Sequence, residues 1–141
     1  MAFQTHKNWP YGCLEDSYAP KANEAIEEGM MVKLDSNGEL VKADGSVDEY
    51  AMIAIIKQPE NFFEQGEKIT VIKENASVMT DQYKQGDAYV PHAKLQVSQV
   101  GGEQGIVRLH QGGATVPVIG RFVEFVSHDE TTFMKIDLTR S

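Results

Sequence analysis

The sequence predicts an all-β fold, a small barrel of short antiparallel strands that follows an extended N-terminal arm. From Gly29 onward, brief runs rich in Val, Ile and aromatic residues are separated by Gly, Asn and Asp, as strands are separated by turns. Some runs alternate apolar and polar residues, as in Lys68–Ile72, which is typical of strands with one face in water. Residues 1–28 show no sustained period of either 2 or 3.6 and are interrupted by prolines.

The arm, residues 1–28, is the first element. Its aromatic content is too high for a solvated tail, so we expect its rings to pack against a protein surface. The aromatic residues are Phe3, Trp9, Tyr11 and Tyr18. Near the end of the arm, Asn23–Glu28 has the composition of one or two helical turns, with Asn23 as the N-cap and Gly29 as the stop.

The next element is a β-hairpin formed by Met30–Leu34 and Glu39–Ala43. The residues between them, Asp35-Ser36-Asn37-Gly38, include the Asn-Gly pair that readily takes the positive φ angles of two-residue hairpin turns. Further strands are predicted, in order, at Tyr50–Ile56, Lys68–Lys73, Ala76–Thr80, Ala88–Val90, Leu95–Gln99, Ile106–His110, Val116–Val126 and Phe133–Leu138.

Residues 29–141 are predicted as one β domain, with a faint echo between two halves at about 29–85 and 86–141. Two pairs of segments carry the echo: Ile53-Ala54 before Lys68–Val71 corresponds to Ile119-Gly120 before Lys135–Leu138, and Gly29–Val32 corresponds loosely to Gly86–Val90. A duplication explains this similarity, but so does the small set of residue types that strands and turns favour. The sequence leaves both alternatives open.

Charge and composition exclude several classes of function. The chain has 141 residues and a formal net charge of −8, without a cluster of Lys or Arg, so it would repel a phosphate backbone. We therefore expect no direct nucleic-acid partner. The longest apolar run, Tyr50–Ile56, is far shorter than the roughly 20 residues of a membrane-spanning helix. The lone Cys13 permits no internal disulfide, and the N-terminus has no secretory pattern, so synthesis in the cytoplasm is expected.

Candidate catalytic and metal-binding residues do not form recognisable motifs. The histidines are His6, His92, His110 and His128, and no two have the close spacing of a local zinc-binding pair. Cys13 lies in no nucleophile signature, and the glycine-rich segments lack the Lys-Ser/Thr of a phosphate loop. We interpret those segments, 101–105 and 111–113, as mobile hairpin connections. The prediction is therefore a protein with no catalytic, cofactor-binding or metal site.

Phe62 and Phe63 are adjacent bulky rings in a polar loop, and neighbouring residues of a strand cannot both face one side of a sheet. One ring is expected to reach a neighbouring molecule. The alternative is that the loop folds back and both rings cover the end of the barrel.

The order and spacing of four segments resemble those of the head decoration, or cement, proteins of tailed bacteriophages. The segments are Gly29–Ala43, Tyr50–Ile56, Gln65–Ile72 and Gln85–Val90, with a weaker match at Val118–Leu138. The family pattern is a Gly-x-x-Val-x-Leu…Gly-x-Leu-Val-x-Ala hairpin, followed by an Ile-Gly/Ala strand and a Gly-x-x-Val-x-Val strand. Ala54 stands where the family often has Gly. The resemblance implies a small barrel or β-tulip-like fold.

The resemblance further implies a non-enzymatic virion protein that binds the outer surface of an assembled capsid, made in the bacterial cytoplasm. Its partners would be the major capsid protein and further copies of itself, with a trimer favoured over a dimer. The residues expected at the capsid or subunit interface are Phe3, His6, Trp9, Tyr11, Tyr18, Phe62 and Phe63. The alternatives are another virion β protein, such as a tail-tube, adaptor or fibre-base subunit, and a small ligand-binding barrel or enzyme.

Overall fold

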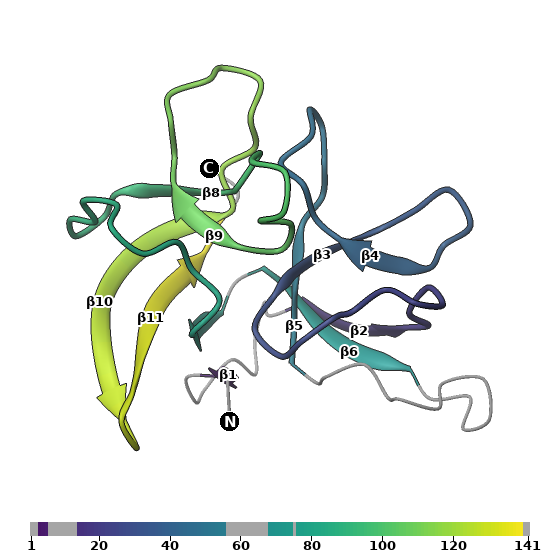
Figure 1. The fold of residues 1–141 in the computed structure, drawn as a ribbon, viewed down its shortest axis with the longest axis horizontal. Helices are drawn as coiled ribbons and strands as arrows, with labels where there is room; N and C mark the ends of the chain where they lie inside the picture. Colours follow the sequence, from purple (N-terminus) through teal and green to yellow (C-terminus); the bar gives the residue numbers. More distant parts are fainter. Residues whose placement is uncertain (1–2, 6–13, 56–67, 75, 140–141) are drawn as a thin grey trace.

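The protein is built from β-strands that form two sheets (Figure 1). The structure is a computed structural model that describes residues 3–5, 14–55, 68–74 and 76–139. Within them the strands are β1 (Phe3–Thr5), β2 (Leu14–Tyr18), β3 (Met31–Leu34), β4 (Leu40–Lys42), β5 (Met52–Ala54), β6 (Ile69–Glu74), β7 (Ser77–Thr80), β8 (Lys94–Val97), β9 (Val107–Leu109), β10 (Gly120–His128) and β11 (Thr131–Leu138). The predicted all-β fold of short antiparallel strands is confirmed. No helix in these ranges is long and apolar enough to cross a membrane.

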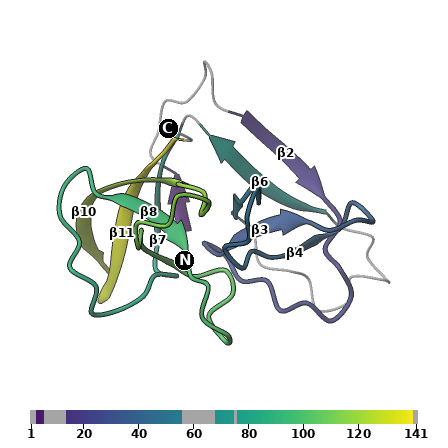
Figure 2. The same cartoon turned by 90° about the horizontal axis from the view of Figure 1, so that it is seen from above.

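The two sheets repeat one strand order. The N-terminal sheet has the order β2-β6-β5-β3-β4, and the C-terminal sheet has the order β1-β7-β11-β10-β8-β9. Without β1, both sheets place their strands in the order first, fifth, fourth, second, third along the chain. The two sheets form the two sides of the molecule in Figure 2. Apart from β1, the chain changes from the N-terminal to the C-terminal sheet between β6 and β7, whereas the predicted halves divide at about residue 85.

The same repeat includes a contact at the edge of each sheet. After its first strand, the chain crosses to the opposite edge and forms one parallel bridge with the third strand, Pro20 with Leu40 and Tyr83 with Val107. One bridge does not make a continuous ladder, so the predicted barrel is not closed. In the N-terminal sheet this bridge consists of two hydrogen bonds, from Leu40 N–H to Ala19 O and from Lys21 N–H to Leu40 O, each over 2.9 Å.

A core shared by both sheets joins them. Strand β5 shows how: Ile53 faces this shared core, while Met52 and Ala54 face a smaller cluster that belongs to the N-terminal sheet alone. Burial on both faces explains why the apolar run here does not alternate with polar residues. Backbone hydrogen bonds add to the junction, since Met31 N–H donates to Gly105 O over 2.9 Å and Gly105 N–H donates to Ala43 O over 2.7 Å. The turn at 101–105, predicted as a mobile connection, is therefore held against the N-terminal sheet.

The predicted arm is partly incorporated into the sheets. β1 pairs with β7 through Phe3–Thr5, and β2 pairs with β6 through Leu14–Tyr18. In these two stretches one side of the extended backbone pairs with a strand of the same chain, so this part of the predicted arm lies along the edges of the sheets. The predicted helical turns at Asn23–Glu28 are absent. Asn23 has a φ of 65°, whereas an N-cap residue needs extended backbone, and Ile26 is buried in the smaller cluster.

The predicted hairpin is present, and three residues, 36–38, connect the hydrogen-bonded pair Asp35 and Glu39. Asp35 N–H donates to Glu39 O, Gly38 N–H donates to Asp35 O, and Gly38 takes a φ of 77°. A left-handed glycine at the end of a three-residue connection is the second commonest hairpin type. The Asp35 carboxylate accepts the N–H groups of Glu39 and Asn37, and these bonds hold the pKa of Asp35 below its usual value.

Candidate interaction surface

Four aromatic rings from separate parts of the chain meet on the C-terminal sheet. Phe122 and Phe125 come from β10, whereas Tyr83 and Tyr89 come from the connection between β7 and β8. The Phe125 ring lies 5.0 Å from Phe122, 5.5 Å from Tyr83 and 5.8 Å from Tyr89, measured between ring centroids. We call these four residues the aromatic cluster. The tilted and edge-on arrangements of the pairs are the ones that aromatic quadrupoles favour.

A β-bulge brings Phe125 into the cluster. Residues three apart on a regular strand face opposite sides of a sheet. The pairing of β10 with β11 shifts between Phe122 and Glu124, so that Val123 is the extra residue. Phe122 and Phe125 therefore lie on the same face. Phe122 is buried, but Phe125 keeps 44% of its surface exposed, so the cluster has both a buried base and a solvent-facing ring.

The exposed side of the cluster forms the wall of an open hollow of about 650 Å³. Its aromatic walls are Tyr83, Tyr89 and Phe125, and its acidic residues are Asp81, Asp87 and Glu130. Glu130 reaches it from the β10–β11 turn, where Asp129 and Glu130 both take positive φ angles, 49° and 66°. Two successive positive φ angles are typical of type I′ turns, which usually contain Asn-Gly.

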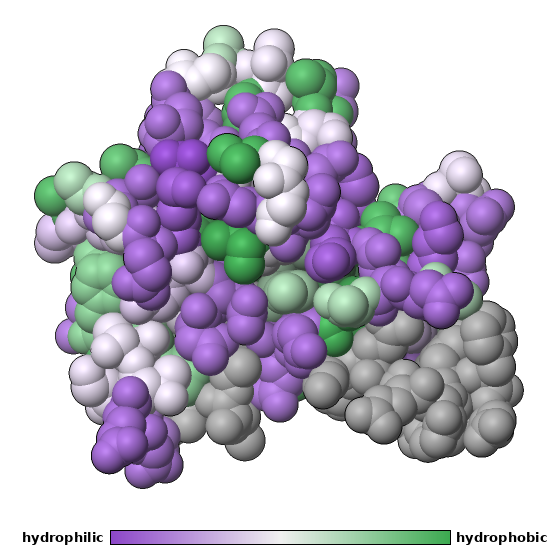
Figure 3. Space-filling model, viewed as in Figure 1, coloured by the Kyte–Doolittle hydropathy of each residue, from purple (hydrophilic) through white to green (hydrophobic). Residues whose placement is uncertain are grey.

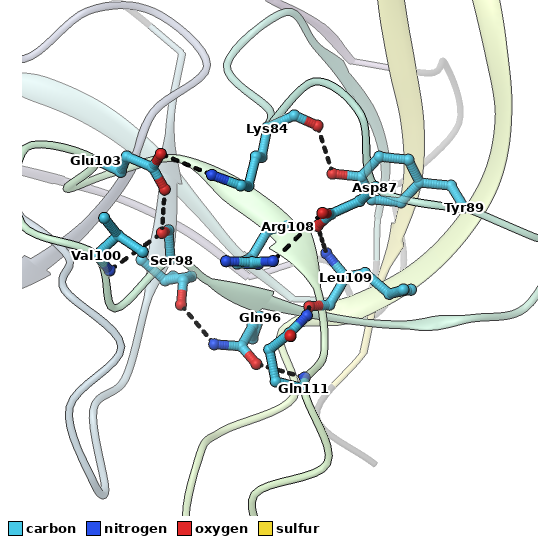
Figure 4. Close-up of polar contacts among 11 residues, drawn as sticks. Lys84, Asp87, Tyr89, Gln96, Ser98, Val100, Glu103, Arg108, Leu109 and Gln111 are labelled. Carbon is cyan, nitrogen blue, oxygen red and sulfur yellow. Dashed lines mark hydrogen bonds and ion pairs between the residues drawn. The ribbon is translucent and has the colours of Figure 1, made fainter.

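Polar contacts fix the loop that carries Tyr89 (Figure 4). The Tyr89 hydroxyl donates to Lys84 O over 2.8 Å, and the Asp87 carboxylate accepts from Arg108 Nη2 at 3.3 Å and from Leu109 N–H at 3.1 Å. Lys84 Nζ lies 2.8 Å from Glu103 Oε2. These contacts tie the loop to β9 and to the turn at 101–105. Gly86 and His92, both at positive φ, also bound this loop, so that Ala88–Val90 is not the predicted strand.

The electrostatics of this region follow from the same contacts. The hydrogen bonds from Lys84 and Ser98 lower the pKa of Glu103, which stays ionised at neutral pH. Burial raises the pKa of the Tyr89 phenol, so this ring stays neutral. Asp87 is neutralised locally by Arg108, whereas no salt bridge to Asp81 or Glu130 is found among the described residues. The hollow therefore has a negative rim beside neutral aromatic faces.

On the face shown in Figure 3, hydrophobic residues form small separate groups in a mostly hydrophilic surface. Groups of three or more His, Cys, Asp or Glu residues able to hold a metal ion are not found in residues 3–5, 14–55, 68–74 and 76–139.

Of the predicted interface residues, Tyr18 alone has a described side chain. Its ring packs against the smaller cluster of the N-terminal sheet, its hydroxyl donates to Asp16 Oδ2, and Lys73 Nζ lies 5.4 Å from its centroid. Phe3 belongs to β1, whose side chains are not described. The remaining predicted interface residues lie outside the described residues: His6, Trp9, Tyr11, Phe62 and Phe63. Cys13 lies outside them as well.

Sequence reasoning did not single out the aromatic cluster. Tyr83, Tyr89 and Phe125 are brought together by pairings that are distant in the chain, and the three-residue spacing of Phe122 and Phe125 places them on opposite faces of a regular strand. The bulge at Val123 places the two rings on the same face, and no sequence motif in β10 predicts that bulge.

Comparison of the chain with models of protein families and with curated proteins found no match to either.

Proposed function

We propose that this protein is a structural component of a tailed-phage head that binds the outside of the assembled capsid and stabilises it. The proposal assigns it no catalytic role and no cofactor. It would act as a homo-oligomer, a trimer in preference to a dimer, with the major capsid protein as its partner. The resemblance in Gly29–Val90 suggested this role, and the position of the N-terminal segment supports it.

The observation that carries the proposal is that the N-terminal segment supplies an edge strand to each sheet. β1 ends the C-terminal sheet and β2 ends the N-terminal sheet, and each has one strand partner among the described strands. The outer side of an edge strand presents backbone donors and acceptors that pair readily with a strand of another protein. A segment that lies along both edges can therefore bind a capsid subunit through its backbone, with its aromatic side chains supplying affinity.

Two further properties agree with attachment to a large lattice. An oligomer that contacts several capsid subunits gains from effective concentration, so weak individual contacts suffice. The net charge of −8 would keep coated particles apart in solution.

Co-sedimentation with capsids that lack this protein tests the proposal. The intact chain should sediment with the capsids, and deletion of residues 2–12 should abolish attachment while circular dichroism still reports the β fold. Trp9→Ala should weaken attachment more than Phe63→Ala does, because the N-terminal segment is the proposed anchor. Attachment of the deleted chain at the level of the intact protein would contradict the proposal.

A tail-tube subunit is the second candidate, and one observation favours it. The hairpin of β10 and β11, with strands of nine and eight residues, is the longest among the described strands, and it extends beyond the rest of the C-terminal sheet (Figure 1). Tail-tube subunits would use such hairpins to join their neighbours. Rings or tubes formed by the purified protein without capsids, seen by electron microscopy, would select this function over decoration.

A further inference from the structure

We propose that the hollow beside the aromatic cluster binds a cationic side chain, preferably arginine, presented by an extended segment of a partner protein. The residues that line this hollow are not part of the N-terminal segment, so the inference does not depend on attachment to a capsid through that segment. Its occupant is a basic segment because the walls and the rim of the hollow both favour positive charge.

The walls provide the first contribution. A cation within about 6 Å of the centroid of a Tyr or Phe ring is attracted by the negative face of that ring. Phe125 is 44% exposed, and Tyr83 and Tyr89 line the same hollow. Tyr89 stays neutral because burial raises its pKa, and its hydroxyl is already engaged with Lys84 O. The rings can therefore attract a cation through their faces, and the Tyr89 hydroxyl adds no negative charge of its own.

The rim provides the second contribution. Asp81 and Glu130 line the hollow. Among the described residues neither carboxylate has a salt bridge, and Asp81 Oδ1 accepts one hydrogen bond, from Gln82 Nε2 at 3.2 Å. Asp87 is less available, because Arg108 and the N–H of Leu109 already contact it. A planar guanidinium can stack on an aromatic ring while its N–H groups donate to carboxylates at the edge, whereas a lysine ammonium makes fewer of these contacts at once.

The arrangement is held in place before any ligand arrives. The Val123 bulge keeps Phe125 on the face of Phe122, and Asp87 fixes the loop that carries Tyr89 against β9. Glu130 lines the hollow from a turn in which its φ is 66°. This left-handed backbone conformation is energetically unfavourable for any residue other than glycine. Preorganisation of this kind reduces the entropy lost on binding.

Titration of the whole protein with a short peptide tests the inference. The probe is acetyl-Gly-Gly-Arg-Gly-Gly-amide, and the matched probe replaces Arg by citrulline, which has nearly the same shape without the charge. We expect the Arg peptide to shift the NMR signals of the Phe125 and Tyr83 rings, with a dissociation constant on the order of 1–10 mM. The citrulline peptide should bind about tenfold more weakly, and added NaCl should weaken the Arg peptide.

Three variants locate the site. Phe125→Leu keeps an apolar side chain but removes the ring, and it should weaken the Arg peptide about two- to fivefold. Glu130→Gln should weaken it by a similar factor. Glu124→Gln is the matched control, because it removes one negative charge from the same hairpin on the opposite face to Phe125, and it should leave the binding nearly unchanged.

Each of three results would overturn the inference. They are the absence of ring shifts at about 20 mM Arg peptide, equal binding of the Arg and citrulline peptides, and equal loss of binding in Glu130→Gln and Glu124→Gln. The last result would mean that the net charge of the protein, and not the hollow, attracts the peptide. Thermal unfolding of each variant ensures that a loss of binding is not a loss of folding.

Discussion

Replacement of Gly45 by alanine tests how closely the two sheets pack. Gly45 lies after β4 with a φ of 77°, and a Cβ atom there would lie 2.7 Å from Gln99 Cγ and 2.8 Å from Val97 O. The left-handed backbone alone costs alanine about 1 kcal/mol. The collision with the end of β8 adds about 1–3 kcal/mol, because Val97 O belongs to the backbone of a paired strand and cannot move away freely.

Gly38→Ala is the matched control, because Gly38 has the same φ of 77° and nothing lies within 4 Å of the position of its Cβ. We expect Gly38→Ala to lower the free energy of unfolding by about 1 kcal/mol and Gly45→Ala to lower it by about 2–4 kcal/mol. Urea unfolding at 25 °C measures both, and each kcal/mol corresponds to about 3–4 °C in Tm. Equal destabilisation by the two variants would refute the close packing of the 44–49 loop against β8.

Three further predictions concern the core, a turn and a charge. Ile53→Ala, in the core shared by both sheets, should lower the free energy of unfolding by about 2–5 kcal/mol in a single transition seen by both fluorescence and circular dichroism. The double replacement of Asp129-Glu130 by Asn-Gly should raise it by about 1 kcal/mol, since Asn-Gly fits the positive φ angles of that turn, and Tm checks this. The hydrogen bond from Lys33 lowers the pKa of Asp44 to about 2. Its folded-state pKa is thus below its unfolded value, so Asp44 stabilises the fold above about pH 4 and this contribution is lost as the pH falls toward 2. Asp44→Asn should remove that part of the pH dependence, which stays below about 1 kcal/mol because the side chain is half exposed.

Local pattern was sufficient to predict most strands. The hairpin of β3 and β4 was predicted from apolar residues on either side of Asn37-Gly38, and the runs that became β5, β6 and β11 were recognised from their Val, Ile and aromatic content. These properties belong to short stretches of chain, so a single sequence reveals them. The same reasoning predicts a strand at Ala88–Val90, where the structure instead has a loop whose Tyr89 ring stacks on Phe122.

Properties that depend on distant pairing were not predictable in the same way. The sequence could not tell that Ile53 and Met52 would be buried on opposite faces of one strand, because both are simply apolar. It also could not show that β1 and β2 would occupy sheet edges within the chain. The candidate site depends on a bulge at Val123 and on a turn held at positive φ by Asp129 and Glu130, and neither has a distinctive sequence signal.

The strand order that the two sheets share is the arrangement that a duplication would produce. Segments at Ile53 and Ile119, noted as similar in sequence, lie at corresponding fourth strands of the two sheets, but Gly86–Val90 does not correspond to β3. The counterpart of β3 is β8. A shared origin of the two sheets stays a prediction, and the common order of five strands is the observation that any account of it has to explain.

Electron cryo-microscopy of the intact phage particle tests the central proposal most directly. The account predicts density for the two packed sheets on the outer surface of the head, with the N-terminal segment in contact with the major capsid protein and repeated about a symmetry axis of the shell. Density for this chain in the tail tube, or on the head with the N-terminal segment turned away from the capsid, would contradict it.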